Sequence, residues 1–483
     1  MKPIAASPST GHRPAAGPRL RLAALLTAAG TLAGCASFSA DGGFATVEQA
    51  AKDRLGKEVR WSRTDADQDG IDQRVGELLA KPLSADDAVQ IALLNNRGLQ
   101  ASFQELGITE AEVVQAGRVP NPGFSLGRFR RGDEIELERG LHFNLARLIA
   151  MPMISAVEAR RFAATQSLVT MNMLAVAAQT RKAWVSALAA EESVRYTRQV
   201  MQAAEASAEL ARRMEQVGNF NKLQRAREQS FHAEAALNVA RAEQARRATR
   251  ERLTRLLGLW GVQTQFKLPD RLPDLPPDLA DRPDIERVAL AQRLDVQAAR
   301  LAAEQTARNL GLTKTTRFIN VLELGVVRNS SNEAPTQRGW EIGFELPLFD
   351  WGGARVARAE AVYMQAVHRA AETAIDARSE VREAYGAWRS AYDIARHHQD
   401  EIVPLRKLVA EENVLRYNGM LIGVFELLAD ARLQIASVNA AIEARRDFWL
   451  AQADLDMALI GKPSLTPAAG PAMAADTGGG AAH

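Results

Sequence analysis

Two periods of hydrophobic and polar residues alternate along the chain, and they predict two kinds of element. Over long stretches apolar residues recur every three or four positions, as at Val381, Ala384 and Trp388. This is the spacing of one face of an amphipathic helix. It predicts two very long helices, over about 156–216 and 353–416. At a rise of 1.5 Å per residue, each would extend roughly 90 Å.

Apolar residues alternate with mainly polar ones in two short segments, and two further segments, 319–328 and the weaker 124–130, are also candidates for strands. A period of two is typical of a strand with one apolar and one polar face. Such a strand suits the wall of a membrane barrel, between lipid and water, and the alternative is a surface sheet in a soluble α+β protein. The predicted strands cover about 124–130, 134–145, 319–328 and 340–346.

Each half of the chain also contains shorter helices and a reversal. The pattern predicts a helix from about 84 to 118, with Ser84 as its N-cap. The long helices reverse at turns over 217–221 and 417–423 and return as second helices. Asn221 is a suitable cap for the first returning helix.

The order of elements occurs twice, which indicates an internal duplication. The segment Leu99–Ala101 is matched by 296–298, and Leu256–Gly258 by 459–461, each about 200 residues further along. A proline-rich connector joins the two halves. Its prolines forbid a continuous helix there, so the halves are predicted to be separate units. The predicted organisation is a signal peptide over 1–34, an N-terminal lipidated segment over 35–82, a first repeat over 83–267, the connector over 268–284, a second repeat over 285–463 and a disordered tail over 464–483.

The single cysteine lies at an informative place. Basic residues precede the apolar run 22–32, which is followed by 32-LAGC-35. A basic start, a short apolar core and small residues describe a secretory signal. Its end at Cys35 resembles the bacterial lipoprotein box, in which the cysteine is lipidated and becomes the N-terminus. An ordinary signal peptide with an incidental cysteine is the alternative.

Composition and motifs point away from nucleic-acid binding and catalysis. The net charge of +2 over 483 residues provides no basic field for nucleic acid. The sequence has no Walker loop, GxSxG or HExxH motif. The acidic stretch 65–72 resembles a calcium loop, but position twelve is Gly76 where glutamate is needed. We therefore predict no enzyme activity, no cofactor and no metal site.

Five motifs, in this order and spacing, carry a family resemblance. Over about Leu83 to Pro463 the chain resembles the TolC family of outer-membrane efflux proteins. The motifs are 82-PLSADDAVQIALLNN-96, 119-VPNPGFSLG-127, 252-RLTRLLGL-259, 346-LPLFDWGGARVARAEA-361 and 424-VFELLADAR-432.

The resemblance implies a fold and an assembly. The chain would be mainly α with a small β part, built as a duplicated helix–strand–strand–long helical hairpin. Three chains would form an α-helical barrel continuous with a 12-stranded antiparallel β-barrel, with four strands from each chain. This homotrimer would lie in the outer membrane of a Gram-negative bacterium, anchored by lipid and extending into the periplasm.

The resemblance also implies a function. The trimer would be the passive exit duct of a tripartite efflux or secretion system, joined to a periplasmic adaptor and an inner-membrane pump. The alternative is a non-conducting coiled-coil lipoprotein that serves as a periplasmic scaffold or adaptor. Amphipathic strands in both halves favour the duct.

Three sets of residues are candidates for this function. Threefold symmetry would turn Glu411 and Glu412 into carboxylate rings at the narrow end of the tunnel, although a solvated helix face is the alternative. At the hairpin tips, Met214 and Met420 stand where the family usually has tyrosine and glycine. The tip residues expected to contact the adaptor are Val217, Gly218, Asn219, Tyr417, Asn418 and Gly419. The residues expected to line the barrel lumen are Glu136, Glu138, Glu341 and Glu345.

Overall fold

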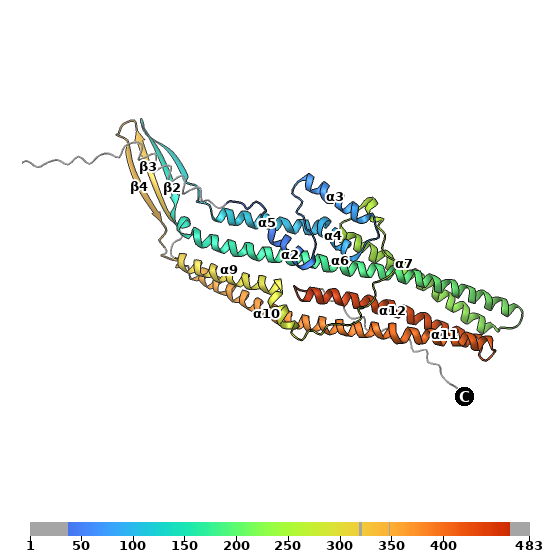
Figure 1. The fold of residues 1–483 in the computed structure, drawn as a ribbon. Helices are drawn as coiled ribbons and strands as arrows, with labels where there is room; N and C mark the ends of the chain where they lie inside the picture. Colours follow the sequence, from blue (N-terminus) through green and yellow to red (C-terminus); the bar gives the residue numbers. More distant parts are fainter. Residues whose placement is uncertain (1–36, 318–320, 347, 464–483) are drawn as a thin grey trace, which may run out of the picture.

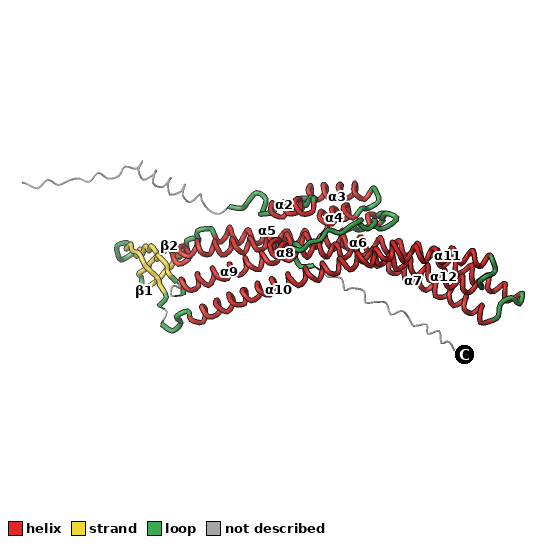
Figure 2. The backbone as a smooth tube through the Cα atoms, turned by 60° about the horizontal axis from the view of Figure 1, so that its bottom comes forward, coloured by secondary structure: helices red, strands yellow, loops and turns green. Residues whose placement is uncertain are grey.

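The chain folds into a long helical body with a small sheet at one end, as the ribbon in Figure 1 shows. The computed structural model describes residues 37–317, 321–346 and 348–463. Figure 2 shows the helices running along the length of the molecule, away from the strands. The predicted signal peptide, Cys35 and the predicted tail lie outside the described residues.

The sheet joins the two halves of the chain. Its strands are β1 (Gly123–Arg131), β2 (Glu134–Asn144), β3 (Leu322–Ser331) and β4 (Gln337–Phe344). They pair antiparallel in the order β1-β2-β3-β4, so β2 of the first half pairs with β3 of the second. All four predicted strands are confirmed, with boundaries that shift by a few residues.

The prediction of one continuous helix over 84–118 is wrong. The segment forms α4 (Ala85–Asn95) and α5 (Arg97–Ala116), with a break at Asn96. The Asn96 side chain accepts a hydrogen bond from the amide of Leu99 at 2.9 Å and donates one to the carbonyl of Leu256 at 2.8 Å. It therefore caps α5 and ties this break to the end of a distant helix. Ser84 caps α4, as predicted.

Two helical hairpins form the body. The first consists of α6 (Leu145–Gln216) and α7 (Lys222–Leu257). Contrary to prediction, α6 begins immediately after β2, where the Asn144 side chain caps it by accepting from the amide of Arg147 at 2.8 Å. Asn221 caps α7, as predicted.

The second hairpin is less regular than predicted. Its outgoing arm is α10 (Gly353–His397), a π-helical turn η2 (His398–Ile402) and α11 (Val403–Asn418), and its returning arm is α12 (Val424–Ala458). The expected unbroken helix over 353–416 is thus interrupted. The remaining elements are α2 (Ala45–Leu55), α3 (Asp65–Leu79), the 3₁₀ turn η1 (Gly261–Thr264), α8 (Ile285–Gln292) and α9 (Leu294–Thr316).

A buried tryptophan marks the core of each half. Trp184 lies among buried residues of α4, α6 and α7, and its indole N–H donates to the Leu83 carbonyl at 2.8 Å. Trp388 packs with Phe448 of α12 and donates to the Gln452 side chain at 2.7 Å. Trp388 lies on the predicted apolar face of its helix, and satisfied indole N–H groups let both tryptophans lie in the core.

The start of the chain packs against the first repeat. Phe44 before α2 packs edge-on against Phe103 of α5, with ring centroids 5.0 Å apart. The acidic stretch 65–72 lies in the first turns of α3, where Thr64 and Asp67 form a capping box. The stretch is therefore helical and does not form the loop that calcium binding requires.

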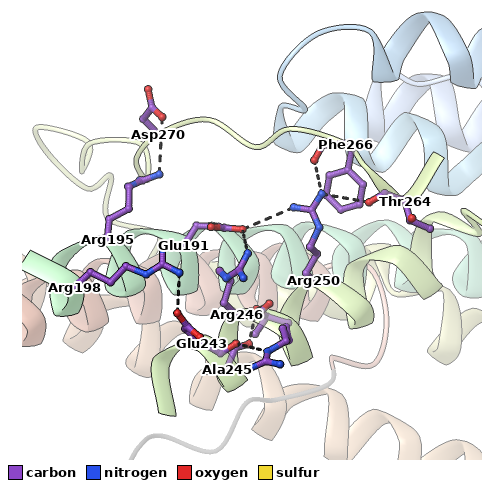
Figure 3. Close-up of polar contacts among 12 residues, drawn as sticks. Glu191, Arg195, Arg198, Glu243, Ala245, Arg246, Arg250, Thr264, Phe266 and Asp270 are labelled. Atoms are coloured by element: carbon purple, nitrogen blue, oxygen red, sulfur yellow. Dashed lines mark hydrogen bonds and ion pairs between the residues drawn. The ribbon is translucent and has the colours of Figure 1, made fainter. Parts of the chain in front are cut away.

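Arginines of the first hairpin hold the segment that leads into the connector (Figure 3). Glu191 of α6 lies 3.6 Å from Arg246 and 3.8 Å from Arg250 of α7. Arg250 also donates to the Thr264 carbonyl at 3.3 Å and to the Phe266 carbonyl, and it stacks over the Phe266 ring. Burial lowers the pKa of Arg250. These contacts fix the chain where the first repeat leads into the connector.

No helix among the described residues is both long enough and apolar enough to cross a membrane.

Candidate functional site

The sheet has one apolar face and one polar face. The register pairs Phe124 with Leu141, Leu141 with Val326 and Val326 with Trp340, so these side chains share a face. Three of them are well exposed, with Phe124 at 69% and Trp340 at 73%. An exposed apolar face on a sheet of this size requires a cover, because water does not favour so large a patch.

The opposite face collects the predicted lumen carboxylates. Glu136 and Glu138 lie on β2, on the same face as His142. Gly325 of β3 pairs with His142 on one side and with Glu341 of β4 on the other, so Glu341 lies on this face too. Glu345 follows the end of β4, where its amide donates to the Val321 carbonyl at 3.3 Å. Three of the four predicted residues thus share the polar face within the sheet.

Two glycines make room for a polar group on this face that the sequence reading missed. The Nδ1 atom of His142 lies 3.0 Å from a carboxylate oxygen of Glu341, and its Nε2 lies 2.9 Å from the Ser125 hydroxyl. A Cβ on Gly325 would stand 2.6 Å from Glu341 Cγ, and one on Gly140 would stand 2.6 Å from His142 Nε2. The glycines in these strands therefore mark close side-chain packing across three strands.

The strand-to-helix junctions of the two halves differ. Gly352 has φ of 74° and precedes α10, and a Cβ there would lie 2.9 Å from the Arg317 carbonyl oxygen. Gly352 therefore lets the chain bend from strand to helix. The first half has no such loop, since α6 follows β2 directly.

Both hairpin tips are exposed and share one turn geometry. The amides of Val217 and Gly218 donate to carbonyls of the last turn of α6, and those of Gly419 and Met420 do the same at the end of α11. Gly218 has φ of 76°, and Met420 occupies the matching position with φ of 58°. Every predicted tip residue is exposed: Val217, Gly218, Asn219, Tyr417, Asn418 and Gly419.

The predicted gate residues lie on an exposed part of α11. Glu411 is 63% exposed and lies 3.8 Å from Lys407, one turn earlier. Glu412 is also exposed. A single chain does not bring the three copies of either residue together, so their ring is a feature of the proposed assembly.

An ion pair between the hairpins is a second feature that the sequence reading missed. Glu228 of α7 is buried and lies 2.9 Å from Arg432 of α12. Its other carboxylate oxygen accepts a hydrogen bond from the Ser207 hydroxyl of α6 at 2.7 Å. Arg432 also stacks over the Phe231 ring. The helical pattern alone does not reveal this pair, because its members lie some 200 residues apart on different hairpins.

Within the described part of the chain, no group of three or more His, Cys, Asp or Glu side chains could hold a metal ion.

Comparison with known proteins identifies the fold. No protein-family model matches the chain, and no curated protein matches it. Among solved structures, the Campylobacter jejuni CmeC outer membrane channel matches with a TM-score of 0.66 at 18% identity, over 84% of this chain and 91% of that one. The open state of the Neisseria gonorrhoeae MtrE outer membrane channel matches at 0.64 and 19% identity, over 78% and 90%.

A third solved structure agrees with these two. The outer membrane protein VceC of Vibrio cholerae matches with a TM-score of 0.64 at 14% identity, over 82% of this chain and 97% of VceC. The three matches cover 90% or more of each channel chain and more than three quarters of this one. The chain therefore has the fold of the TolC-type outer-membrane efflux channels, as the resemblance in its sequence predicted.

Proposed function

We propose that three copies of this chain form the outer-membrane exit duct of an efflux or secretion system. The observation that carries the proposal is the open sheet. It has four strands, two unpaired edges on β1 and β4, and an exposed apolar face. Unpaired edges cannot face lipid, because their backbone groups would have no hydrogen-bond partners. Three such sheets joined edge to edge would close a barrel of twelve strands.

The helices supply the second part of the duct. In the trimer, the two hairpins of each chain would surround a tunnel that continues the barrel across the periplasm. The duct conducts passively, and a periplasmic adaptor docks at the exposed hairpin tips and links it to an inner-membrane pump. This chain would then need no catalytic site, and we assign it no enzyme activity.

The carboxylates give the duct its selectivity. Glu136, Glu138 and Glu341 would line the water-filled barrel, with Glu345 at its periplasmic edge. Glu411 and Glu412 would form two rings of three carboxylates near the narrow end of the tunnel, where they raise the affinity for cations. We also propose that Cys35 carries the lipid that anchors the mature chain, and that Trp340 and Phe349 lie at the membrane interfaces.

Conductance in planar bilayers tests this function. We expect heat-modifiable trimers in outer-membrane fractions, and cation-selective channels from the purified trimers. Glu341→Gln should weaken the cation preference because it removes three lumen charges from each trimer. Glu251→Gln, at an exposed position of α7, is the matched control. Anion-selective channels that Glu341→Gln leaves unchanged would contradict the lumen assignment, and a monomer without conductance would favour the scaffold.

A further inference from the structure

Arginines interrupt the apolar face of the sheet at a single level. The register pairs Arg139 of β2 with Arg328 of β3, and Arg328 with Arg338 of β4. These three residues, the arginine row, share the face that carries Leu141, Val326 and Trp340. Neighbouring strands lie about 4.8 Å apart, so the three arginines stand side by side at one level of the sheet.

The arginine row has no carboxylate partner on its face. Arg328 and Arg338 are exposed and Arg139 is half-buried, and the ion pairs and hydrogen bonds of the described residues include none of their side chains. Alternation along the strands places all strand glutamates on the opposite face and two more arginines, Arg128 and Arg130, further out on this one. Like charges directly opposite each other destabilise a sheet. An anion from outside the chain would relieve this repulsion.

The height of the arginine row along the strands corresponds to the outer edge of the apolar band of a membrane barrel. Arg328 lies six residues from Leu322, the first residue of β3, which is at the helical end of the sheet. Six residues extend roughly 20 Å along a strand. In a barrel whose strands tilt by about 40°, this corresponds to a height of roughly 15 Å along the barrel axis. Exposed apolar residues continue past that end at Leu346, Phe349 and Trp351. They supply the remaining height of an apolar band of about 25 Å.

The arginine row would therefore stand at the outer rim of the band, on the side away from the periplasmic helices. Arginine on a lipid-facing strand is costly at the middle of a bilayer and tolerated near its interface. The guanidinium group binds phosphate oxygens in a bidentate manner, and three in a row fit the clustered phosphates of a lipid headgroup. The anion that this surface meets at the outer leaflet is a phosphorylated glycolipid.

We propose that Arg139, Arg328 and Arg338 bind the phosphates of outer-leaflet glycolipid and so fix the depth of the trimer in the membrane. This inference rests on the proposed function, because the sheet must be in the outer membrane for the row to meet the lipid. The two adjoining arginines, Arg128 and Arg130, would extend the same surface toward the sugar headgroups.

Lipid binding to the detergent-solubilised trimer tests the proposal. Native mass spectrometry would compare bisphosphorylated lipid A with dephosphorylated lipid A, phosphatidylglycerol and inorganic phosphate. The wild-type trimer should bind bisphosphorylated lipid A about tenfold or more tightly than the dephosphorylated form, as expected when charged hydrogen bonds are lost. Equal affinity for the two forms would overturn the proposal. Phosphatidylglycerol or free phosphate that binds as tightly would overturn the choice of glycolipid.

Matched variants assign the binding to the arginine row. Arg139→Gln, Arg328→Gln and Arg338→Gln together should abolish the preference for the phosphorylated form. The control combines Arg227→Gln, Arg252→Gln and Arg255→Gln, which remove the same charge from exposed helical positions and should retain the preference. If the glutamine variant does not assemble, the corresponding lysine variant keeps the charge but loses the bidentate geometry, so its preference for the phosphorylated form should be weaker than that of the wild type. A preference that survives in the glutamine variant contradicts the assignment.

The outcome also separates this inference from the proposed function. A wild-type trimer that is integral to the outer membrane and conducts ions, but shows no preference for phosphorylated lipid, overturns the arginine row alone. A wild-type chain that washes out of the membrane fraction overturns both.

Discussion

Single residues determine where helices begin and where the chain reverses. Ser84 and Asn221 could be predicted as caps because a cap bonds to amides two or three residues away, within its own sequence neighbourhood. The break at Asn96 could not be predicted in this way. Asn96 bonds to the Leu256 carbonyl, and a Cβ on Gly258 would stand 2.5 Å from the Asn95 carbonyl oxygen. Contacts across the fold therefore determine this break.

Met420 is the residue at which backbone strain meets a proposed contact surface. It has φ of 58°, a conformation that glycine adopts freely and that costs other residues about 1 kcal/mol or more. It is 93% exposed, so packing does not compensate for the strain. Among the described residues, it is the one non-glycine position with positive φ.

Met420→Gly should stabilise the second hairpin tip. We expect a gain of about 1 kcal/mol, because glycine adopts the left-handed conformation without a Cβ clash. Hydrogen exchange of the amides over 415–424 should slow about fivefold. The control is Gly218→Ala, which should destabilise the first tip because alanine disfavours φ of 76°. Faster exchange in Met420→Gly would contradict this account of the turn.

Elements differ in how far their sequence predicts them. The strands followed from a period of two and the hairpins from a period of three to four, since both reflect local burial. The hydrophobic pattern did not predict the π turn η2, although Pro404 lies just beyond it. Proline has no amide hydrogen for the helix ladder, and a π turn is a common place where a helix absorbs such a defect. The periodicity before and after the turn gave no sign of it.

The two hairpins are coupled by Glu228 and Arg432. Glu228→Gln keeps an oxygen for the Ser207 hydroxyl but removes the charge that Arg432 faces. Because Arg432 remains partly in water, we expect a loss of about 1–2 kcal/mol. Hydrogen exchange over 426–436 of α12 should accelerate about tenfold, while α4 and its Trp184 contacts should be unaffected.

A double-mutant cycle with Arg432→Gln separates the pair from its neighbours. The two single variants and the double variant should lose similar stability if the ion pair carries the coupling. Additive losses would show instead that each residue acts through other contacts, such as the stacking of Arg432 over Phe231.

At the scale of the whole molecule, the proposed duct requires two further copies of the chain. The fold of a chain could be predicted because the motifs recur in order in both halves. The pairing of β2 with β3 unites those halves in one sheet. The polar face of the sheet could also be predicted from alternation, but the His142–Glu341 pair could not, because its geometry depends on register across three strands.

Removal of the proposed anchor tests how the molecule is held in the membrane. With residues 1–34 replaced by the leader of a non-lipidated secreted protein, Cys35→Ser should lose its acyl chains. The trimer should nevertheless stay in the outer-membrane fraction after a carbonate wash, because a closed barrel holds more firmly than acyl chains do. Release of this variant as a soluble periplasmic monomer would contradict the duct and support the scaffold.

The length of α6 fixes a distance within the molecule. Its 72 residues span about 108 Å from the end of β2 to the first tip. Since α6 begins directly after the last residue of β2, with no loop between them, the number of residues in α6 sets the distance from the sheet to the first tip. Each inserted residue would lengthen the arm by 1.5 Å and rotate everything beyond it by 100°. In the proposed duct, an adaptor that meets the tips would have to match this length, and the length of α6 would have to suit the width of the periplasm.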